Sequence, residues 1–198
     1  LPQIVRLERP SGGKAALRAA AAILSEAHFP VILNGAGVVI GGAISASAAL
    51  AERLTAPVCC GYQHNDAFPG SHPLSVGPLG YNGSKAAMEL IAKADVILAL
   101  GTRLNPFSTL PGYGIDYWPQ NAKVIQVDIN SDRIGLTKKV TVGIQGDAKL
   151  VAEQLIEILS DSAGDHGRDE RSALISETKS RWLQQLSFMD HEDDDPGT

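Results

Sequence analysis

The sequence predicts an α/β domain of the doubly wound, Rossmann-like type, with a parallel sheet of about six strands in the middle of three layers. Short apolar runs without interruption alternate with helical stretches along the chain. Such runs are typical of strands buried on both faces, as in parallel sheets. Aromatic residues make up 5% of the chain, so Ala, Val, Ile and Leu form most of the core. The length of 198 residues allows one such domain and an additional arm.

Most of the strands and helices are visible as local patterns. Five apolar runs predict strands over residues 31–34, 57–60, 95–100, 123–128 and 140–144. Helical periodicity or capping predicts helices over residues 12–27, 43–54, 84–93, from 147 onward, and 168–189. Ser11 and Ser84 are expected to cap the N-termini of two of these helices. Residues 61–83 and 103–120 show no periodic pattern.

These patterns divide the chain into three parts. We expect an interdomain linker over residues 1–10, the central domain over 11–160, and a linker with a helical arm over 161–198. The arm is expected to lead toward a missing C-terminal domain. The chain begins with Leu1 instead of Met and ends in an acidic segment, residues 191–198. Both observations favour a piece of a larger protein.

Charge and composition exclude several classes of function. The net charge is -5 and no stripe of Lys or Arg is present, which argues against nucleic-acid binding. No apolar run reaches the roughly 18 residues of a membrane span, and no signal peptide is recognisable. A cytoplasmic location is therefore expected. Cys59 and Cys60 are neighbours in a predicted strand and point to opposite faces, which favours buried free thiols over a disulfide.

The candidate ligand-binding residues follow the ends of predicted strands, where ligands bind in parallel sheets. They are Gly35, Gly37, Gly101, Arg103 and Asp128. Gly35 and Gly37 could bring backbone N–H groups to a phosphate, or they could serve only a tight strand-to-helix turn. Arg103 could reach a diphosphate and Asp128 a ribose. Alternatively, Arg103 pairs with an acid at the sheet edge and Asp128 caps a turn before Asn130.

Other candidate sites are weaker. Ile40 stands where a dinucleotide fingerprint requires a third glycine, and no acid ends the second strand. The spacing of His64, Asp66 and His72 fits no standard metal site, so surface or interface histidines are expected. No nucleophile elbow or P-loop is present, and no catalytic residue is expected in this chain. The two irregular stretches are rich in aromatic residues, so we expect them to fold over the sheet edge or to pack on another domain.

Several motifs in fixed order resemble the middle domain of thiamine-diphosphate enzymes, among them acetohydroxyacid synthase, pyruvate oxidase and glyoxylate carboligase. The motifs are FPGSHPL at 68–74, GPLGY at 77–81, ADVILALGTR at 94–103, VDIN at 127–130, IG at 134–135 and IQGDA at 144–148. The resemblance covers about residues 11–160. Within the family, GYQHNDAF at 61–68 and LNPFSTLPGYG at 104–114 are most similar to the sulfoacetaldehyde acetyltransferase branch.

The resemblance implies an enzyme that converts sulfoacetaldehyde and phosphate to acetyl phosphate and sulfite in the breakdown of taurine-type sulfonates. It implies a subunit of three domains, assembled as a homodimer or homotetramer. The N-terminal domain would supply the Glu that activates thiamine diphosphate, and the C-terminal domain would hold its diphosphate and Mg²⁺. Both domains lie outside this chain. The family's metal motif begins Gly-Asp-Gly, and residues 146–148 of this chain read Gly-Asp-Ala, without the glycine at the third position. This fragment alone is expected to be inactive.

Middle domains of this family bind FAD in some members, another nucleotide in others and no nucleotide in many. The resemblance places the five candidate residues in that groove. Asn130 stands where FAD-binding members often carry Asp, so an empty or anion-occupied groove is expected. Three alternatives remain: the middle domain of an acetolactate synthase-like enzyme, a separate FAD- or NAD-binding module, and an architectural domain that organises an oligomer.

Overall fold

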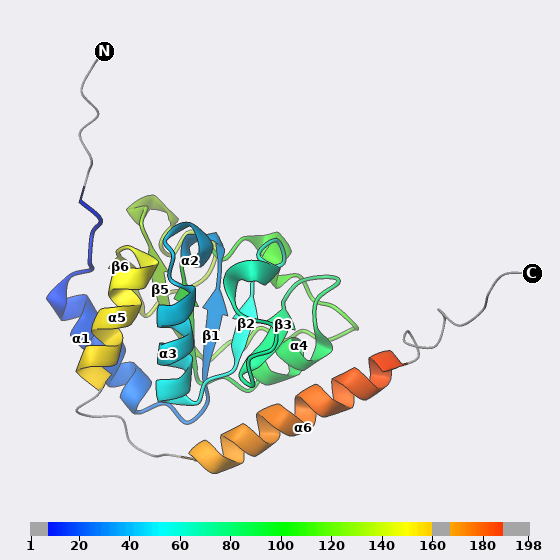
Figure 1. Ribbon diagram of the computed structural model, residues 1–198. Helices are drawn as coiled ribbons and strands as arrows, with labels where there is room; N and C mark the ends of the chain where they lie inside the picture. Colours follow the sequence, from blue (N-terminus) through cyan, green and yellow to red (C-terminus); the bar gives the residue numbers. More distant parts are fainter. Residues whose placement is uncertain (1–7, 160–166, 188–198) are drawn as a thin grey trace, which may run out of the picture.

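The computed structural model describes residues 8–159 and 167–187. Its centre is a sheet of six parallel strands in the order β3-β2-β1-β4-β5-β6 (Figure 1). The strands are β1 (Pro30–Asn34), β2 (Val58–Cys60), β3 (Ser75–Pro78), β4 (Val96–Leu100), β5 (Lys123–Asp128) and β6 (Val142–Gln145). The chain runs outward from β1 in one direction and then crosses to β4, so the order reverses between these two strands. The predicted fold class is confirmed.

Helices cover both faces of the sheet. On one face lie α1 (Lys14–Ser25), α3 (Ile44–Leu54) and α5 (Ala148–Leu159), and α5 packs against both α1 and α3 (Figure 1). The Asn34 amide at the end of β1 donates to Ser47 Oγ of α3 on this side. On the other face lies α4 (Lys85–Ile91), where Cys59 Sγ is 3.9 Å from the Ala87 carbonyl oxygen. Ser84 caps α4 as predicted, because its Oγ accepts from Ala87 N.

The two cysteines are free and buried, as the sequence predicts. Cys59 faces α4, and the strand alternation turns Cys60 to the opposite face. Burial raises the pKa of the Cys60 thiol to about 12, and the neighbouring Asp66 carboxylate adds to the shift. Burial also raises the pKa of Cys59 well above its usual value. Both residues therefore act as small apolar core side chains.

The prediction that Ser11 caps the first helix is wrong. Helix α1 begins at Lys14, its N-cap is Gly13, and Ser11 instead forms an antiparallel bridge with Gly146. The side-chain amide of Gln154 donates to the Ser11 carbonyl oxygen. Pairing with the β6–α5 junction thus keeps the backbone of Ser11 extended, and this long-range contact overrides the local capping preference of serine.

Two elements escaped prediction because they are short and contain Gly or Pro. Strand β3 reads SVGP and lies at the edge of the sheet, where Pro is tolerated. Its register with β2 shifts between Val58 and Cys59, and Gly77 has a φ of +91°. Helix α2 (Ala36–Ile40) occupies the turn after β1. The 3-10 helices η1 (Asn65–Ala67), η2 (Pro106–Thr109) and η3 (Ser131–Arg133) lie in further connections.

The C-terminal arm is the helix α6 (Arg168–Leu186), which runs along the domain and packs on α4 (Figure 1). Among the apolar residues of this helix, Ile175 is buried whereas Leu183 is exposed. The Arg171 guanidinium donates to the carbonyl oxygens of His28, Leu54 and Thr55. Most of the predicted linker before this helix, residues 160–166, and the predicted helix end at 188–189 lie outside the described residues. Within the described part, no helix is long and apolar enough to cross a membrane.

Candidate functional site

A cleft of about 480 Å³ opens at the carboxyl edge of the sheet, where β1, β4 and β5 end. All five residues predicted from the sequence line it: Gly35, Gly37, Gly101, Arg103 and Asp128. They meet because parallel strands bring their carboxyl ends to one edge. The cleft also lies at the reversal of strand order between β1 and β4, the usual ligand position in such sheets.

The glycines of the cleft allow two backbone turns to touch. A Cβ atom on Gly37 would lie 2.7 Å from Gly101 Cα, and Gly101 itself has a φ of +61°. The N–H of Gly35 donates to the Leu100 carbonyl at 3.0 Å, and that of Gly37 donates to the Gly101 carbonyl at 2.8 Å. The tight-turn alternative therefore accounts for these contacts, and a bound anion would need other donors.

Two arginines offer such donors. Arg103 and Arg133 both line the cleft and are exposed, and neither forms an ion pair with an acid in the described residues. The buried amide of Gln126 holds the backbone beside both of them. Its Nε2 donates to the carbonyl oxygens of Thr102 and Arg133, each at 3.1 Å. Arg133 and Gln126 were missed in the sequence, although a Gln inside the apolar strand KVIQVD is a recognisable signal.

Asp128 lies at the end of β5 and is buried. Its Oδ1 accepts a hydrogen bond of 2.9 Å from Asn130 N, so the turn-cap alternative describes this carboxylate correctly. The matching alternative for Arg103, a pair with an acid at the sheet edge, is wrong within the described residues. Asn130 in turn caps η3, because its Oδ1 accepts from Asp132 N.

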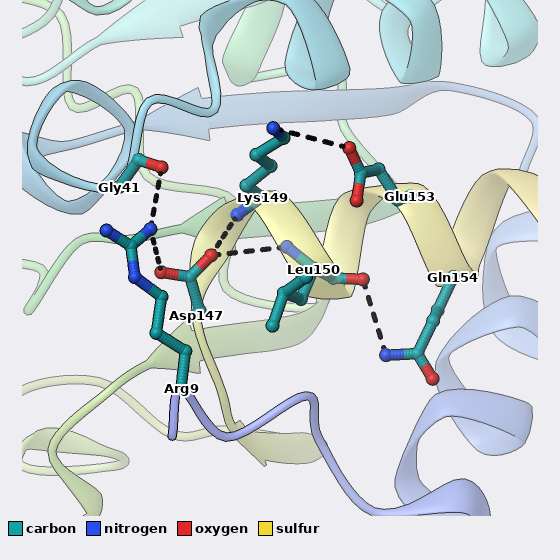
Figure 2. A network of polar contacts seen from close by, with 7 residues as sticks. All are labelled: Arg9, Gly41, Asp147, Lys149, Leu150, Glu153 and Gln154. Atoms are coloured by element: carbon teal, nitrogen blue, oxygen red, sulfur yellow. Dashed lines mark hydrogen bonds and ion pairs between the residues drawn. The ribbon is translucent and has the colours of Figure 1, made fainter. Parts of the chain in front are cut away.

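A polar network closes the β6 side of the cleft (Figure 2). Arg9 Nη1 lies 3.2 Å from Asp147 Oδ2 and donates to the Gly41 carbonyl oxygen at 3.1 Å. Asp147 Oδ1 accepts from the backbone N–H groups of Lys149 and Leu150 at the start of α5. Asp147 thus caps α5, as its predicted place at the helix start implies, and both of its oxygens are engaged. Arg9 was not predicted as a cleft residue.

His64 and His72 lie beside different acids. His64 lines the cleft, and its Nδ1 is 3.9 Å from an oxygen of Asp66. His72 Nε2 lies 3.2 Å from Glu52 Oε1. The described residues hold no group of three or more His, Cys, Asp or Glu side chains that could bind a metal ion.

The two irregular stretches flank the cleft on its β2 side. Gly61, Gln63, Asn105 and Ser108 contribute to its wall. Tyr117 belongs to the core instead: it is 1% exposed, and its hydroxyl donates to the Leu110 carbonyl oxygen at 2.9 Å. Burial raises the pKa of Tyr117 to about 12. The other tyrosines of these stretches and Phe107 remain exposed.

Comparisons with known proteins agree with this architecture. Residues 17–155 match the family model "Thiamine pyrophosphate enzyme, central domain". A solved structure of a putative thiamin diphosphate-dependent enzyme from Mycobacterium smegmatis has a TM-score of 0.66, at 23% identity over 83% of this chain and 31% of that one. At this identity the similarity concerns the fold alone.

Curated relatives are similar over the whole chain. A probable sulfoacetaldehyde acetyltransferase of Rhizobium meliloti is 78% identical over all 198 residues, which are 34% of its length. The sulfoacetaldehyde acetyltransferase of Roseovarius nubinhibens is 74% identical over 100% of this chain and 33% of its own. A probable acetolactate synthase large subunit of Methanocaldococcus jannaschii is 35% identical over 86% of this chain and 26% of its own. The chain spans about a third of the length of the first two relatives, and it belongs to the family of thiamine pyrophosphate enzyme central domains.

Proposed function

We propose that this chain is the central domain of a thiamine-diphosphate-dependent acetyltransferase that converts sulfoacetaldehyde and phosphate to acetyl phosphate and sulfite. The observation that carries the proposal is identity of 78% and 74% to relatives of that name along all 198 residues. The aligned region includes both long loops beside the cleft, and loops vary more than cores between proteins of different function. The acetolactate synthase relative, at 35%, supports the alternative activity less strongly.

In this proposal residues 1–10 are a linker, 11–160 the central domain, and 161–198 a linker and arm. Thiamine diphosphate supplies the chemistry of bond cleavage, and it would be held with Mg²⁺ by domains outside this chain. The described residues do not fit that role, because they hold no group of three or more side chains that could bind a metal ion, and both oxygens of Asp147 are engaged by Arg9 and by α5. A homodimer or homotetramer and a cytoplasmic location remain predictions.

For the cleft we propose binding of a small anion, with Gly35, Gly37, Gly101, Arg103 and Asp128 as its walls. The support is that Arg103 and Arg133 line the cleft and have no carboxylate partner among the described residues. The buried amide of Gln126 holds the backbone beside both of them. The side chain of Asn130 is engaged at η3, which gives no support to a flavin.

The activity is tested on the full-length protein supplied with thiamine diphosphate and Mg²⁺. We expect acetyl phosphate and sulfite from sulfoacetaldehyde and phosphate, with a kcat/KM about a hundredfold above that for acetolactate formation from pyruvate. Faster acetolactate formation would refute the proposal and favour the acetolactate synthase alternative.

The cleft is tested separately by calorimetry of the full-length protein with phosphate, ADP and FAD. Phosphate is also the proposed substrate, so we expect more than one phosphate site, and Arg103→Ala should weaken binding at one of them about tenfold because a charge-assisted contact is lost. Arg18→Ala is the matched control, since Arg18 is an exposed arginine on α1 that does not line the cleft. Micromolar FAD binding, abolished by Arg103→Ala, would contradict the anion proposal and favour a flavin-binding groove.

A further inference from the structure

A second cavity, of about 430 Å³, opens beside the start of β5, and we call it the lysine pocket. Residues 118–124, which lead into β5, line one side of it, and residues between 137 and 141, which lead into β6, line the other. The cleft described above lies where β1, β4 and β5 end, and the two cavities share no lining residue. The lysine pocket is therefore a separate feature of the domain.

The lysine pocket is basic although the chain is acidic. Lys123, Lys138 and Lys139 line it, and among the described residues no Asp or Glu does. None of the three ammonium groups forms an ion pair with an acid in the described part of the chain. The net charge of the whole chain is -5, so these three cations create a local field of the opposite sign. A field of this kind attracts an anion.

The walls of the pocket are held in place by the protein itself. Thr137 Oγ1 donates to the Leu104 carbonyl oxygen at 2.8 Å. The N–H of Thr141 donates to the Val124 carbonyl oxygen at 2.7 Å, and Val124 N donates to Thr141 Oγ1 at 3.2 Å. Because these bonds fix both sides before a ligand arrives, binding costs less conformational entropy.

Lys138 links the two sides of the pocket. Its Nζ lies 4.6 Å from the centre of the Trp118 ring, a distance at which the face of the ring attracts a cation. An ammonium group has three N–H donors, so this contact orients Lys138 and leaves donors for an anion. The exposed side chains of Lys123 and Lys139 add donors from the two sides.

The size and charge of the pocket fit an organic molecule with two phosphate groups. Its volume of about 430 Å³ equals that of roughly fourteen water molecules, so one inorganic phosphate would leave most of it empty. A phosphate monoester carries a charge of about -1.5 to -2, so two such groups balance three lysines. Ammonium groups bind phosphate as point charges, whereas planar carboxylates favour the fork of an arginine. Among the described residues, no arginine lines this pocket.

The uncharged polar groups of the pocket fit a carbon skeleton that carries hydroxyls. The exposed side-chain amides of Gln120 and Asn121 line the pocket, and neither forms a hydrogen bond with a described residue. Each amide offers two donors and an acceptor, and a hydroxyl group both donates and accepts. Trp118 and Pro119 supply the apolar surface beside these amides.

We propose that the lysine pocket binds a sugar or polyol bisphosphate. Lys123, Lys138 and Lys139 contact its phosphates, and Gln120 and Asn121 contact its hydroxyls. This binding depends neither on the reaction proposed above nor on the anion proposed for the cleft, because the two cavities have no residue in common.

Occupancy is tested by lysine acetylation of the full-length protein loaded with thiamine diphosphate and Mg²⁺, with fructose 1,6-bisphosphate as the probe. Peptide mapping after brief treatment with sulfosuccinimidyl acetate measures the rate at each lysine. At about 5 mM, the bisphosphate should slow acetylation of Lys123 and Lys139 at least about threefold. The exposed Lys14 of α1 is the control and should react at an unchanged rate, and fructose should slow neither pocket lysine. Absence of protection, or equal protection by inorganic phosphate, would overturn the proposal.

The place of binding is tested by calorimetry of variants of the same loaded protein. Lys123→Gln and Lys139→Gln each remove one exposed charge and should weaken bisphosphate binding about tenfold. Lys14→Gln is the matched control, and Arg103→Ala reports on the cleft; both should leave the Kd unchanged within about twofold. Weakening by Arg103→Ala and not by the pocket variants would place the bisphosphate in the cleft and refute the proposal. Neither test measures turnover, so a protein that binds the bisphosphate without acting on sulfoacetaldehyde would refute the proposed function alone.

Discussion

The guanidinium of Arg9 lies 3.2 Å from the carboxylate of Asp147, 138 residues further along the chain. The two partners differ in environment: the Arg9 side chain is 56% exposed and that of Asp147 is 5% exposed. The same carboxylate caps α5 through Lys149 N and Leu150 N. One buried side chain thus joins the entry of the domain, the wall of the cleft and the start of a helix.

Asp147→Ala should therefore destabilise the chain by about 2–3 kcal/mol, since it removes a helix cap and a charged acceptor. Arg9→Ala should cost below about 1 kcal/mol, because its partly exposed ion pair is screened by water. Urea unfolding of both variants measures the difference. Lys149→Ala is the control for the exposed pair with Glu153. An equal cost for Arg9→Ala and Asp147→Ala would show that the ion pair dominates over the cap.

Gly101→Ala should be more damaging than Gly114→Ala, although both glycines have a positive φ, +61° and +70°. A Cβ on Gly114 would meet nothing within 4 Å, so only backbone strain of about 1 kcal/mol is expected. A Cβ on Gly101 would lie 2.8 Å from the Gly37 backbone, and this overlap should raise the cost to about 3 kcal/mol or more. Thermal unfolding compares the two. Similar melting temperatures would mean that the turns can separate cheaply.

Arg171→Met should release α6 from the domain. The buried guanidinium donates to the carbonyl oxygens of His28, Leu54 and Thr55, of which Leu54 and Thr55 form the C-terminal end of α3. Loss of these charge-assisted bonds should cost about 3 kcal/mol and speed hydrogen exchange in residues 168–187. The control is Arg181→Met, which removes a half-exposed pair with Glu89 and should change exchange little. If hydrogen exchange is unchanged in Arg171→Met, the contacts of Ile175 and Trp182 are what hold α6 on the domain.

Tyr117 should make the fold sensitive to alkaline pH. Burial raises the pKa of its hydroxyl to about 12, whereas the unfolded chain keeps a pKa of about 10. The folded state therefore binds this proton more tightly, and the resulting stability is complete below pH of about 10 and lost as pH rises toward about 12. At pH of about 8, Tyr117→Phe should cost about 1 kcal/mol through the lost bond to Leu110. Urea unfolding at several pH values should show this difference shrinking over the window; a constant difference would contradict the shift.

The residues of the candidate site that lie at the end of a strand were predictable from the sequence. Gly35, Gly101 and Asp128 each come directly after an apolar run, and parallel strands bring such positions together whatever the sequence between them. Arg9 and Arg133 were not predictable in this way. Arg9 reaches the cleft only because the entry segment pairs with Gly146, and Arg133 only because Gln126 holds its backbone.

Local periodicity was thus sufficient for the fold class, because continuous apolar runs between helices can bury both faces only in a parallel sheet covered on two sides. It was also sufficient for the edge at which the cleft lies. Contacts between distant residues decided the rest: the start of α1, the edge strand β3, the burial of Tyr117 and the docking of α6 along the domain. In each case the energy comes from a partner far away in the chain, and no short window of sequence contains both partners.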